Sequence, residues 1–312
     1  MVVVMEVNST EQQVEAVIER MLDMGFNPSR TTGQSQTLIA GVGHGAVDLA
    51  SFESMAGVRE AHRISSPFKL ASRLWKPEGT RVALGNAVVG GPDPVFVVRS
   101  SAGETAAGQV SSAAASSAHG VAATAAKLRF GYEGVPVETL RELSLAARAA
   151  GLFAVVEIMD PARIERLSEH ADGFLAPAHQ MENNALLRAL GRQTKPVIVE
   201  RSPSATIDDW LMAAEAILVG GNGNVVLCER GIKTFDAAAL TMDISSIPTI
   251  KKLSHLPVIA DPFRATGKRD RVLSMGRAAL AAGADGLIID AGEALAETLA
   301  EWQHLGSAML AW

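Results

Sequence analysis

Charged and titratable side chains stand where the apolar runs end in the second part of this 312-residue chain. A guanidinium keeps its charge and donates in a fixed fork, so arginines at such ends can grip a carboxylate or a phosphate. A histidine or a carboxylate beside them can move a proton. We therefore expect anion binding from Arg201 and Arg230, and catalytic roles for His179, Glu200, Arg264 and Asp290.

These residues also have a plainer interpretation, because residues between a strand and a helix often cap the helix or form a salt bridge. For His179, which follows Pro177 and precedes an expected helix, capping or packing is weighed equally with catalysis. Glu200 and Arg201 are neighbours on a strand and point to opposite faces, so only one of them needs to face a barrel interior. The single cysteine, Cys228, lies in an apolar run and is interpreted as a buried core residue.

The elements that must position these side chains alternate short apolar strands with helical stretches from residue 95 onward, which indicates parallel β/α units. Eight such units fit an α/β fold, a (β/α)8 TIM barrel, over residues 81–312. The carboxyl ends of its strands would meet at one mouth, where barrels of this kind carry out chemistry. Strands are expected at 95–99, 121–129, 153–157, 173–176, 197–201, 224–228, 257–261 and 286–290.

The first 64 residues indicate a small separate unit. A helix begins after the capping residues Ser9 and Thr10, and its apolar residues recur at helical spacing until Gly25. With the apolar runs around it, the order is β-α-β-β-α-β, which is typical of a ferredoxin-like α+β domain. Residues 65–80 contain Pro and Gly and are expected to form a linker between this domain, 1–64, and the barrel.

Composition limits the classes of partner. Hydrophobic residues make up 48% of the chain and charged residues 20%, as in a globular protein. The formal net charge of -6 argues against nucleic acid or an anionic membrane as partner, since either favours a basic surface. Residues 105–126 lack charge but are too polar to span a membrane. We expect a small anionic substrate, and a cytoplasmic location because the first residues are not typical of a signal peptide.

Two segments carry the motifs of a known family: residues 227–234, which read LCERGIKT, and residues 261–267, which read DPFRATG. Through them the chain resembles the microbial type I 3-deoxy-D-arabino-heptulosonate-7-phosphate (DAHP) synthases that carry an amino-terminal ferredoxin-like regulatory domain. The likeness runs nearly end to end, and the resemblance implies homodimers or homotetramers. Further supporting segments are 66–73, 157–161, 204–215, 253–262 and 281–287.

The resemblance implies a divalent-metal site, which that family builds from a histidine, a cysteine, a glutamate and an aspartate. In this chain Arg264 stands at the histidine's position, Ser101 at the cysteine's and Asp290 at the glutamate's, and the aspartate has no clear counterpart. A guanidinium has no lone pair to coordinate a cation and repels one. We therefore expect no metal and no other cofactor, with Arg264 in the place of the ion.

The resemblance also implies a lining of basic residues for phosphoenolpyruvate and erythrose 4-phosphate. Arg201 and Arg230 match two of the family's arginines, whereas Glu200 replaces a lysine and His179 replaces an arginine. The loop for the sugar phosphate is altered, and its basic residues, with an alternative alignment open, are Lys127 and Arg129.

These substitutions predict that DAHP synthase activity has been lost. The first hypothesis is a repurposed, metal-independent enzyme, a lyase, cyclase or transferase that performs aldol-type or cyclisation chemistry on a small anionic or aromatic-pathway metabolite. The alternative is a non-catalytic ligand-binding or regulatory homologue, since in the family the amino-terminal domain senses aromatic amino acids.

Overall fold

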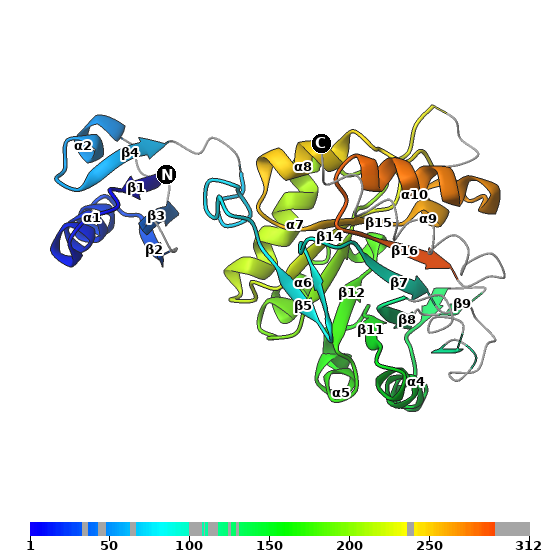
Figure 1. Cartoon of the computed structure of the whole chain (residues 1–312). Coiled ribbons are helices and arrows are strands. Elements are labelled where there is room, and N and C mark those ends of the chain that lie inside the picture. Colours follow the sequence, from blue (N-terminus) through cyan, green and yellow to red (C-terminus); the bar gives the residue numbers. More distant parts are fainter. Residues whose placement is uncertain are drawn as a thin grey trace. The chain divides into compact units, whose positions relative to one another are not determined.

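The computed structural model describes residues 1–32, 37–42, 48–62, 67–99, 108, 110–111, 118–123, 126–128, 131–235 and 240–290. The chain divides into two compact units, Met1–Pro77 and Glu78–Trp312 (Figure 1). The division falls inside the segment 65–80 that was expected to be a linker. Each unit has its own buried apolar core.

The first unit is a four-stranded antiparallel sheet with two helices. The sheet has the order β2-β3-β1-β4, and its core is formed by apolar residues of the sheet and of both helices, among them Val17, Met21 and Phe52. A capping box starts the first helix, because the Thr10 hydroxyl accepts from the Gln13 amide and the Gln13 side chain accepts from the Thr10 amide. The expected ferredoxin-like order is confirmed. Its elements are β1 Val2–Met5, α1 Glu11–Asp23, β2 Asn27–Thr32, β3 Thr37–Val42, α2 Leu49–Glu53 and β4 Val58–His62.

The second unit is built around a closed parallel barrel in which β16 pairs with β7 and β8 pairs with β11 (Figure 1). The α/β fold, with a parallel sheet that follows a ferredoxin-like domain in the sequence, is therefore confirmed. The barrel strands are β7 Val95–Arg99, β8 Gly120–Ala123, β11 Phe153–Glu157, β12 Gly173–Ala176, β13 Val197–Glu200, β14 Val225–Glu229, β15 Val258–Ala260 and β16 Gly286–Asp290.

Helices follow the strands, as expected of parallel β/α units. The described helices of this unit are α4 Val137–Ala149, α5 Ile164–Ser168, α6 Asn184–Gly191, α7 Ile207–Val219, α8 Ser246–Leu253, α9 Pro262–Thr266 and α10 Val272–Ala281, with the short 3₁₀ helices η1 Pro161–Arg163, η2 Ala178–Gln180 and η3 Arg269–Arg271. Within the part of the chain that the structure describes, no helix has the length and apolar character needed to cross a membrane.

The strand expected over 121–129 differs from the observed structure. Only β8 joins the barrel there, and the residues after it form a two-stranded hairpin of β9 Ala126–Leu128 and β10 Gly131–Glu133. The segment before β9 is rich in alanine and carries little β-branched sequence, so periodicity could not separate the two strands.

The amino-terminal end of the barrel is closed by a hairpin of β5 Val82–Leu84 and β6 Ala87–Val89. Its side chains join one apolar cluster with Phe153 and with interior residues of the other strands. Cys228 belongs to this cluster and is fully buried, as the sequence predicted. Because the hairpin closes this end, we expect the active site at the opposite end of the barrel, where the strands have their carboxyl termini.

A candidate active site at the barrel mouth

The alternation of side chains along a strand selects the residues that face the mouth. Val97, Ile198, Ile259 and Ile288 point into the barrel, where they share one apolar cluster. Two positions further along each strand or just beyond it stand polar residues, which the period of two keeps on the same face. These residues are Arg99, Glu200, Asp261 and Asp290.

Arg99, at the end of β7, is the centre of this group. Its Nη2 lies 3.0 Å from Oε1 of Glu200 and 2.5 Å from Oδ2 of Asp261, and its Nε lies 3.7 Å from Oδ1 of Asp290. Only 5% of its side chain is exposed. One guanidinium therefore contacts carboxylates at the ends of three other strands, although Arg99 was not among the predicted catalytic or anion-binding residues.

Glu200 lies between two guanidiniums. Nη1 of Arg230 is 3.3 Å from its Oε2, and the backbone amide of Ala178 donates to the same oxygen at 3.2 Å. Burial alone would raise the pKa of Glu200, but Arg99 and Arg230 outweigh burial and lower it below its ordinary value. Glu200 therefore stays a carboxylate. Its negative charge partly neutralises the two arginines, so a substrate anion at the mouth meets less positive charge.

Two raised pKa values follow from this crowding, and they have opposite effects on charge. Burial works against the charge of Arg99, but the carboxylates of Asp261 and Glu200 prevail and raise its pKa, so it remains a cation. Burial raises the pKa of Asp290, and the nearby Asp261 carboxylate raises it further, against the opposing arginines. The environment of Asp290 therefore favours its protonated form.

Arg264 does not occupy the position expected for it. It lies on α9 with an exposed side chain, and its backbone amide donates to Oδ1 of Asp261 at 2.9 Å, which caps the helix. Asp261 thus stabilises the start of α9 with one oxygen and binds Arg99 with the other. The cation among the buried carboxylates is Arg99, and the prediction that Arg264 fills that place was wrong.

His179 lies on η2, just after β12, at the rim of the mouth. Its Nε2 is 3.4 Å from the sulfur of Met159, and its side chain is partly exposed to solvent. Burial is the largest cause of its lowered pKa, and the positive charge of Arg230 lowers it further while Glu200 opposes. A neutral imidazole near neutral pH can accept or pass on a proton.

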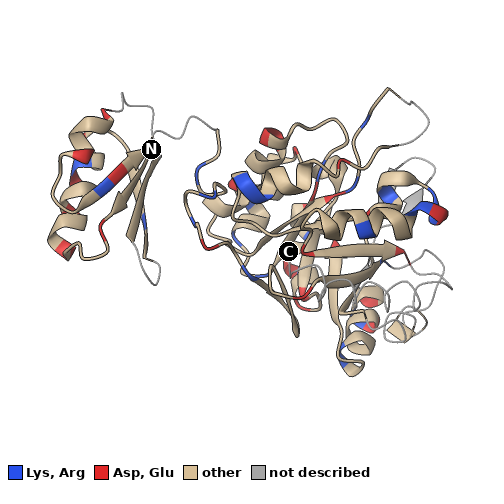
Figure 2. Ribbon diagram, turned by 45° about the horizontal axis from the view of Figure 1, so that its top comes forward, with Lys and Arg blue, Asp and Glu red and all other residues tan. Residues whose placement is uncertain are grey.

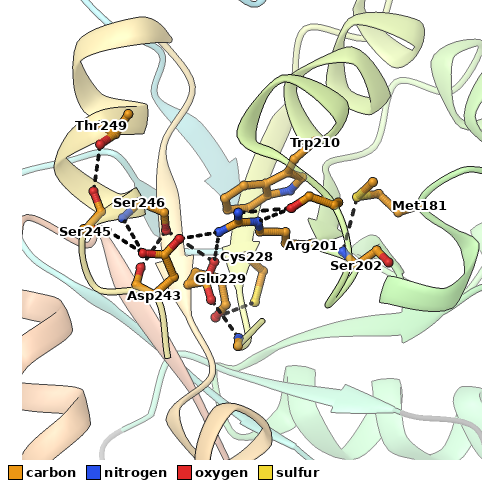
Figure 3. A network of polar contacts seen from close by, with 12 residues as sticks. Met181, Arg201, Ser202, Trp210, Cys228, Glu229, Asp243, Ser245, Ser246 and Thr249 are labelled. Atoms are coloured by element: carbon orange, nitrogen blue, oxygen red, sulfur yellow. Dashed lines mark hydrogen bonds and ion pairs between the residues drawn. The ribbon is translucent and has the colours of Figure 1, made fainter. Parts of the chain in front are cut away.

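Arg201 belongs to a second polar network, which includes Glu229 and Asp243 (Figure 3). Its Nη1 donates to Glu229 at 3.0 Å and to Asp243 at 2.9 Å, while Nε and Nη2 both donate to the carbonyl of Ala205. The guanidinium also lies 5.7 Å from the ring centre of Trp210. Because protein groups already satisfy this buried side chain, its predicted role in substrate binding has no support in the structure.

Glu229 is the acid of this second network. Burial raises its pKa although Arg201 opposes the shift, and its two oxygens accept from Arg201, from the Gly231 amide and from the Ser246 hydroxyl. The network joins β14, the loop after β13 and the start of α8 outside the barrel interior (Figure 3). These contacts hold the three segments together.

The remaining predicted residues divide by what the structure describes. Lys127 lies in β9, whereas Arg129 and Ser101 fall outside the described residues. Lys, Arg, Asp and Glu are interspersed along the ribbon rather than gathered by sign (Figure 2).

Among the described residues, three buried polar atoms near the mouth have no hydrogen-bond partner. They are Nε of Arg99, Nε of Arg230 and Oδ1 of Asp290.

The residues at the mouth do not fit a divalent metal ion. Within the described ranges no group of three or more His, Cys, Asp or Glu could hold one. The acidic oxygens of Glu200 and Asp261 that face the centre already accept from Arg99. A metal ion needs several free donors and is repelled by a guanidinium among them.

The fold and the mouth together define a parallel α/β barrel with a polar carboxyl end, joined to a ferredoxin-like domain. The family model described as DAHP synthetase I family matches residues 104–305, and the model described as DAHP synthase ferredoxin-like domain matches residues 1–66. The chain belongs to the DAHP synthetase I family.

Relatives agree with this assignment. A phospho-2-dehydro-3-deoxyheptonate aldolase from Thermotoga maritima is 33% identical over 298 residues, which cover 93% of this chain and 88% of the relative. The crystal structure of a DAHP synthase from that organism matches with a TM-score of 0.75 and 29% identity, over 99% of this chain and 97% of the other. A 2-dehydro-3-deoxyphosphooctonate aldolase from Syntrophotalea carbinolica is 30% identical but covers only 50% of this chain and 60% of its own length.

These findings overturn one expectation from the sequence. The substitutions at Arg264, Ser101 and Glu200 predicted a repurposed enzyme or a non-catalytic homologue without DAHP synthase activity. That prediction was wrong, because the similarity to the heptonate aldolase extends through both domains.

Proposed function

We propose that this protein is a DAHP synthase, which joins phosphoenolpyruvate to erythrose 4-phosphate. The observation that carries the proposal is the match to the Thermotoga phospho-2-dehydro-3-deoxyheptonate aldolase over 93% of the chain. A seven-carbon product requires a three-carbon and a four-carbon partner. The new bond joins the methylene carbon of phosphoenolpyruvate to the aldehyde carbon of erythrose 4-phosphate. Water adds at the phosphoenolpyruvate carbon that bears the phosphate, and inorganic phosphate leaves.

Arg230 is the residue we assign to the phosphoenolpyruvate anion. It follows β14 on the face that points into the barrel, 18% of its side chain is exposed, and its Nε has no partner among the described residues. A guanidinium with a donor to spare can bind a carboxylate or phosphate in a fixed orientation. Arg264, exposed on α9, is proposed as a second cation at the rim, and Lys127 and Arg129 as ligands of the sugar phosphate.

Proton movements are assigned to two residues with shifted pKa values. Asp290, whose pKa burial raises, can hold a proton for the aldehyde oxygen, which becomes a hydroxyl when the carbon–carbon bond forms. His179, whose pKa is lowered, can take a proton from the attacking water. Glu200 is a positioning residue in this scheme, because it orients Arg230 through their 3.3 Å contact.

The finer features expected from the sequence are part of the proposal. We propose the (β/α)8 form of the barrel for the second unit. The division into 1–64, 65–80 and 81–312, a homodimer or homotetramer, and a cytoplasmic location are proposed on the same footing, supported by the resemblance to the family.

The experiment incubates the purified protein with phosphoenolpyruvate and either erythrose 4-phosphate or a five-carbon aldose phosphate, and identifies the product by mass. We expect the seven-carbon product, at about 1 s⁻¹ or faster, the lower part of the usual enzyme range. The Arg230→Met variant should lose most of this rate, while Arg188→Met, on the outer helix α6, should keep it. An eight-carbon product would favour the octonate aldolases among the relatives, and no product with either sugar would refute the proposal.

A further inference from the structure

We infer that the guanidinium of Arg99 is the resident cation of the barrel mouth and takes the electrostatic place of a divalent metal ion. The inference rests on the proposed function in treating the mouth as the reaction site, but the cation itself can be tested without turnover. It is carried by the contacts of Arg99 with acids from three other strands.

The charge balance of the mouth requires such a cation. Glu200 and Asp261 are almost completely buried, with 3% and 1% of their side chains exposed, and Asp290 is less than a quarter exposed. Carboxylates taken out of water need a nearby positive charge or they become protonated. Arg99 is the cation within 4 Å of all three among the described residues, whereas Arg230 reaches Glu200 alone.

The remaining oxygens show why a metal ion would not share this space. Oε2 of Glu200 accepts from Arg230 and from the Ala178 amide, and Oδ1 of Asp261 accepts from the Arg264 amide. Oδ1 of Asp290 is buried and has no hydrogen-bond partner among the described residues. A divalent ion would have to displace these donors and approach a fixed positive charge at the same time.

A covalently attached guanidinium also behaves differently from a bound ion. It stays charged at every pH in which the protein is folded, it cannot dissociate, and a chelator cannot remove it. If Arg99 is exchanged for an uncharged side chain, the three acids at the ends of β13, β15 and β16 lose the cation that they share. That arrangement resembles an oxygen-ligand site for a hard divalent cation.

The test measures Mn²⁺ binding by equilibrium dialysis and thermal unfolding of the full chain, in chelator and in excess Mn²⁺. We expect wild-type protein to bind no stoichiometric Mn²⁺ at the mouth and to melt at the same temperature in both buffers. Arg99→Met should melt lower in chelator, by on the order of 10 °C, because a buried ion pair has lost one partner. Mn²⁺ should restore about 5 °C of that loss and bind with one equivalent.

Three controls keep the result specific. Arg148→Met removes a cation from an exposed pair with Asp172, and its melting temperature should not respond to Mn²⁺. Arg99→Lys retains a cation and should bind no Mn²⁺, which serves if the methionine variant does not fold. The inference would be overturned if the wild type bound stoichiometric Mn²⁺ and Asp290→Asn did not. It would also be overturned if a folded Arg99→Met variant neither bound Mn²⁺ nor melted at a higher temperature in its presence.

The two proposals fail in different ways. Absence of product with either sugar would refute the synthase function and leave the cation assignment intact. Mn²⁺ held at the mouth of an active wild-type protein would refute the cation assignment and leave the synthase function intact.

Discussion

Arg99 and Asp261 are 162 positions apart in the chain, yet Nη2 of the arginine lies 2.5 Å from Oδ2 of the aspartate inside the barrel. The arginine ends β7 and the aspartate follows β15, and β16 lies between these strands in the sheet. The pair therefore ties together strand ends that share no backbone hydrogen bonds. It also starts α9, because Asp261 caps that helix with its other oxygen.

Arg99 and Glu200 should show a measurable interaction energy. We expect a double-mutant cycle of Arg99→Met and Glu200→Gln, followed by urea unfolding, to give about 1 to 3 kcal/mol, because both groups are buried. The more exposed pair of Arg148 and Asp172 is the matched control, and it should give about 0 to 1 kcal/mol. Equal values for the two pairs would contradict the central position given to Arg99.

Glu200 should contribute to stability in a pH-dependent way. Its pKa in the folded protein is lowered from the ordinary 4.5, so its contribution is present above pH 4.5 and is lost as the pH falls below that value. The difference in unfolding free energy between wild type and Glu200→Gln should therefore shrink from about pH 7 to about pH 3. Glu169→Gln, on an exposed side chain, is the control substitution. A difference that stays constant over this range would contradict the lowered pKa.

Substitution of Arg201 should mainly lower stability, whereas substitution of Arg230 should mainly weaken substrate binding. Arg201→Met leaves Glu229 and Asp243 without their cation and should cost about 3 to 5 kcal/mol of stability, with little change in KM for the folded protein. Arg230→Met should raise KM for phosphoenolpyruvate by roughly tenfold or more, with a smaller effect on stability. Unfolding curves and steady-state kinetics on both variants separate the two roles. A large rise in KM for Arg201→Met would restore it as a substrate ligand.

The activity should depend on pH through the protonation of His179. Burial and Arg230 lower its pKa from the ordinary 6.5, so the imidazole becomes a cation, and stops accepting protons, only at a pH below 6.5. The acid limb of kcat/KM should lie below pH 6.5, and His179→Asn should remove that limb together with most of the rate. An unchanged acid limb in this variant would assign the proton to another group.

Much of the fold follows from local sequence. The strands β7, β11, β12 and β16 begin and end at the residues that the apolar runs predicted, because a strand buried on both faces is written as a short continuous run. The hairpin β9–β10 was missed because the alanine-rich sequence before it has no clear period.

The site was predicted less completely than the fold. The sequence placed charged residues at the mouth, but it could not tell which carboxylate meets which arginine, since the partners of Arg99 lie 101 and 162 positions away. Arg99 is two positions past Val97 and Glu200 is two positions past Ile198, but both strands are apolar on both faces, so the sequence did not show which face points inward. The direction of Arg264 was not open to such counting, because it lies on a helix whose orientation depends on the Asp261 cap.

The most direct measurement is the rate at which wild-type protein forms the seven-carbon phosphate from phosphoenolpyruvate and erythrose 4-phosphate, recorded in chelator and again with Mn²⁺ added. A barrel whose mouth carries its own guanidinium should form the product at the same rate in both buffers. No product in either buffer, or product only after Mn²⁺ is added, would contradict this account.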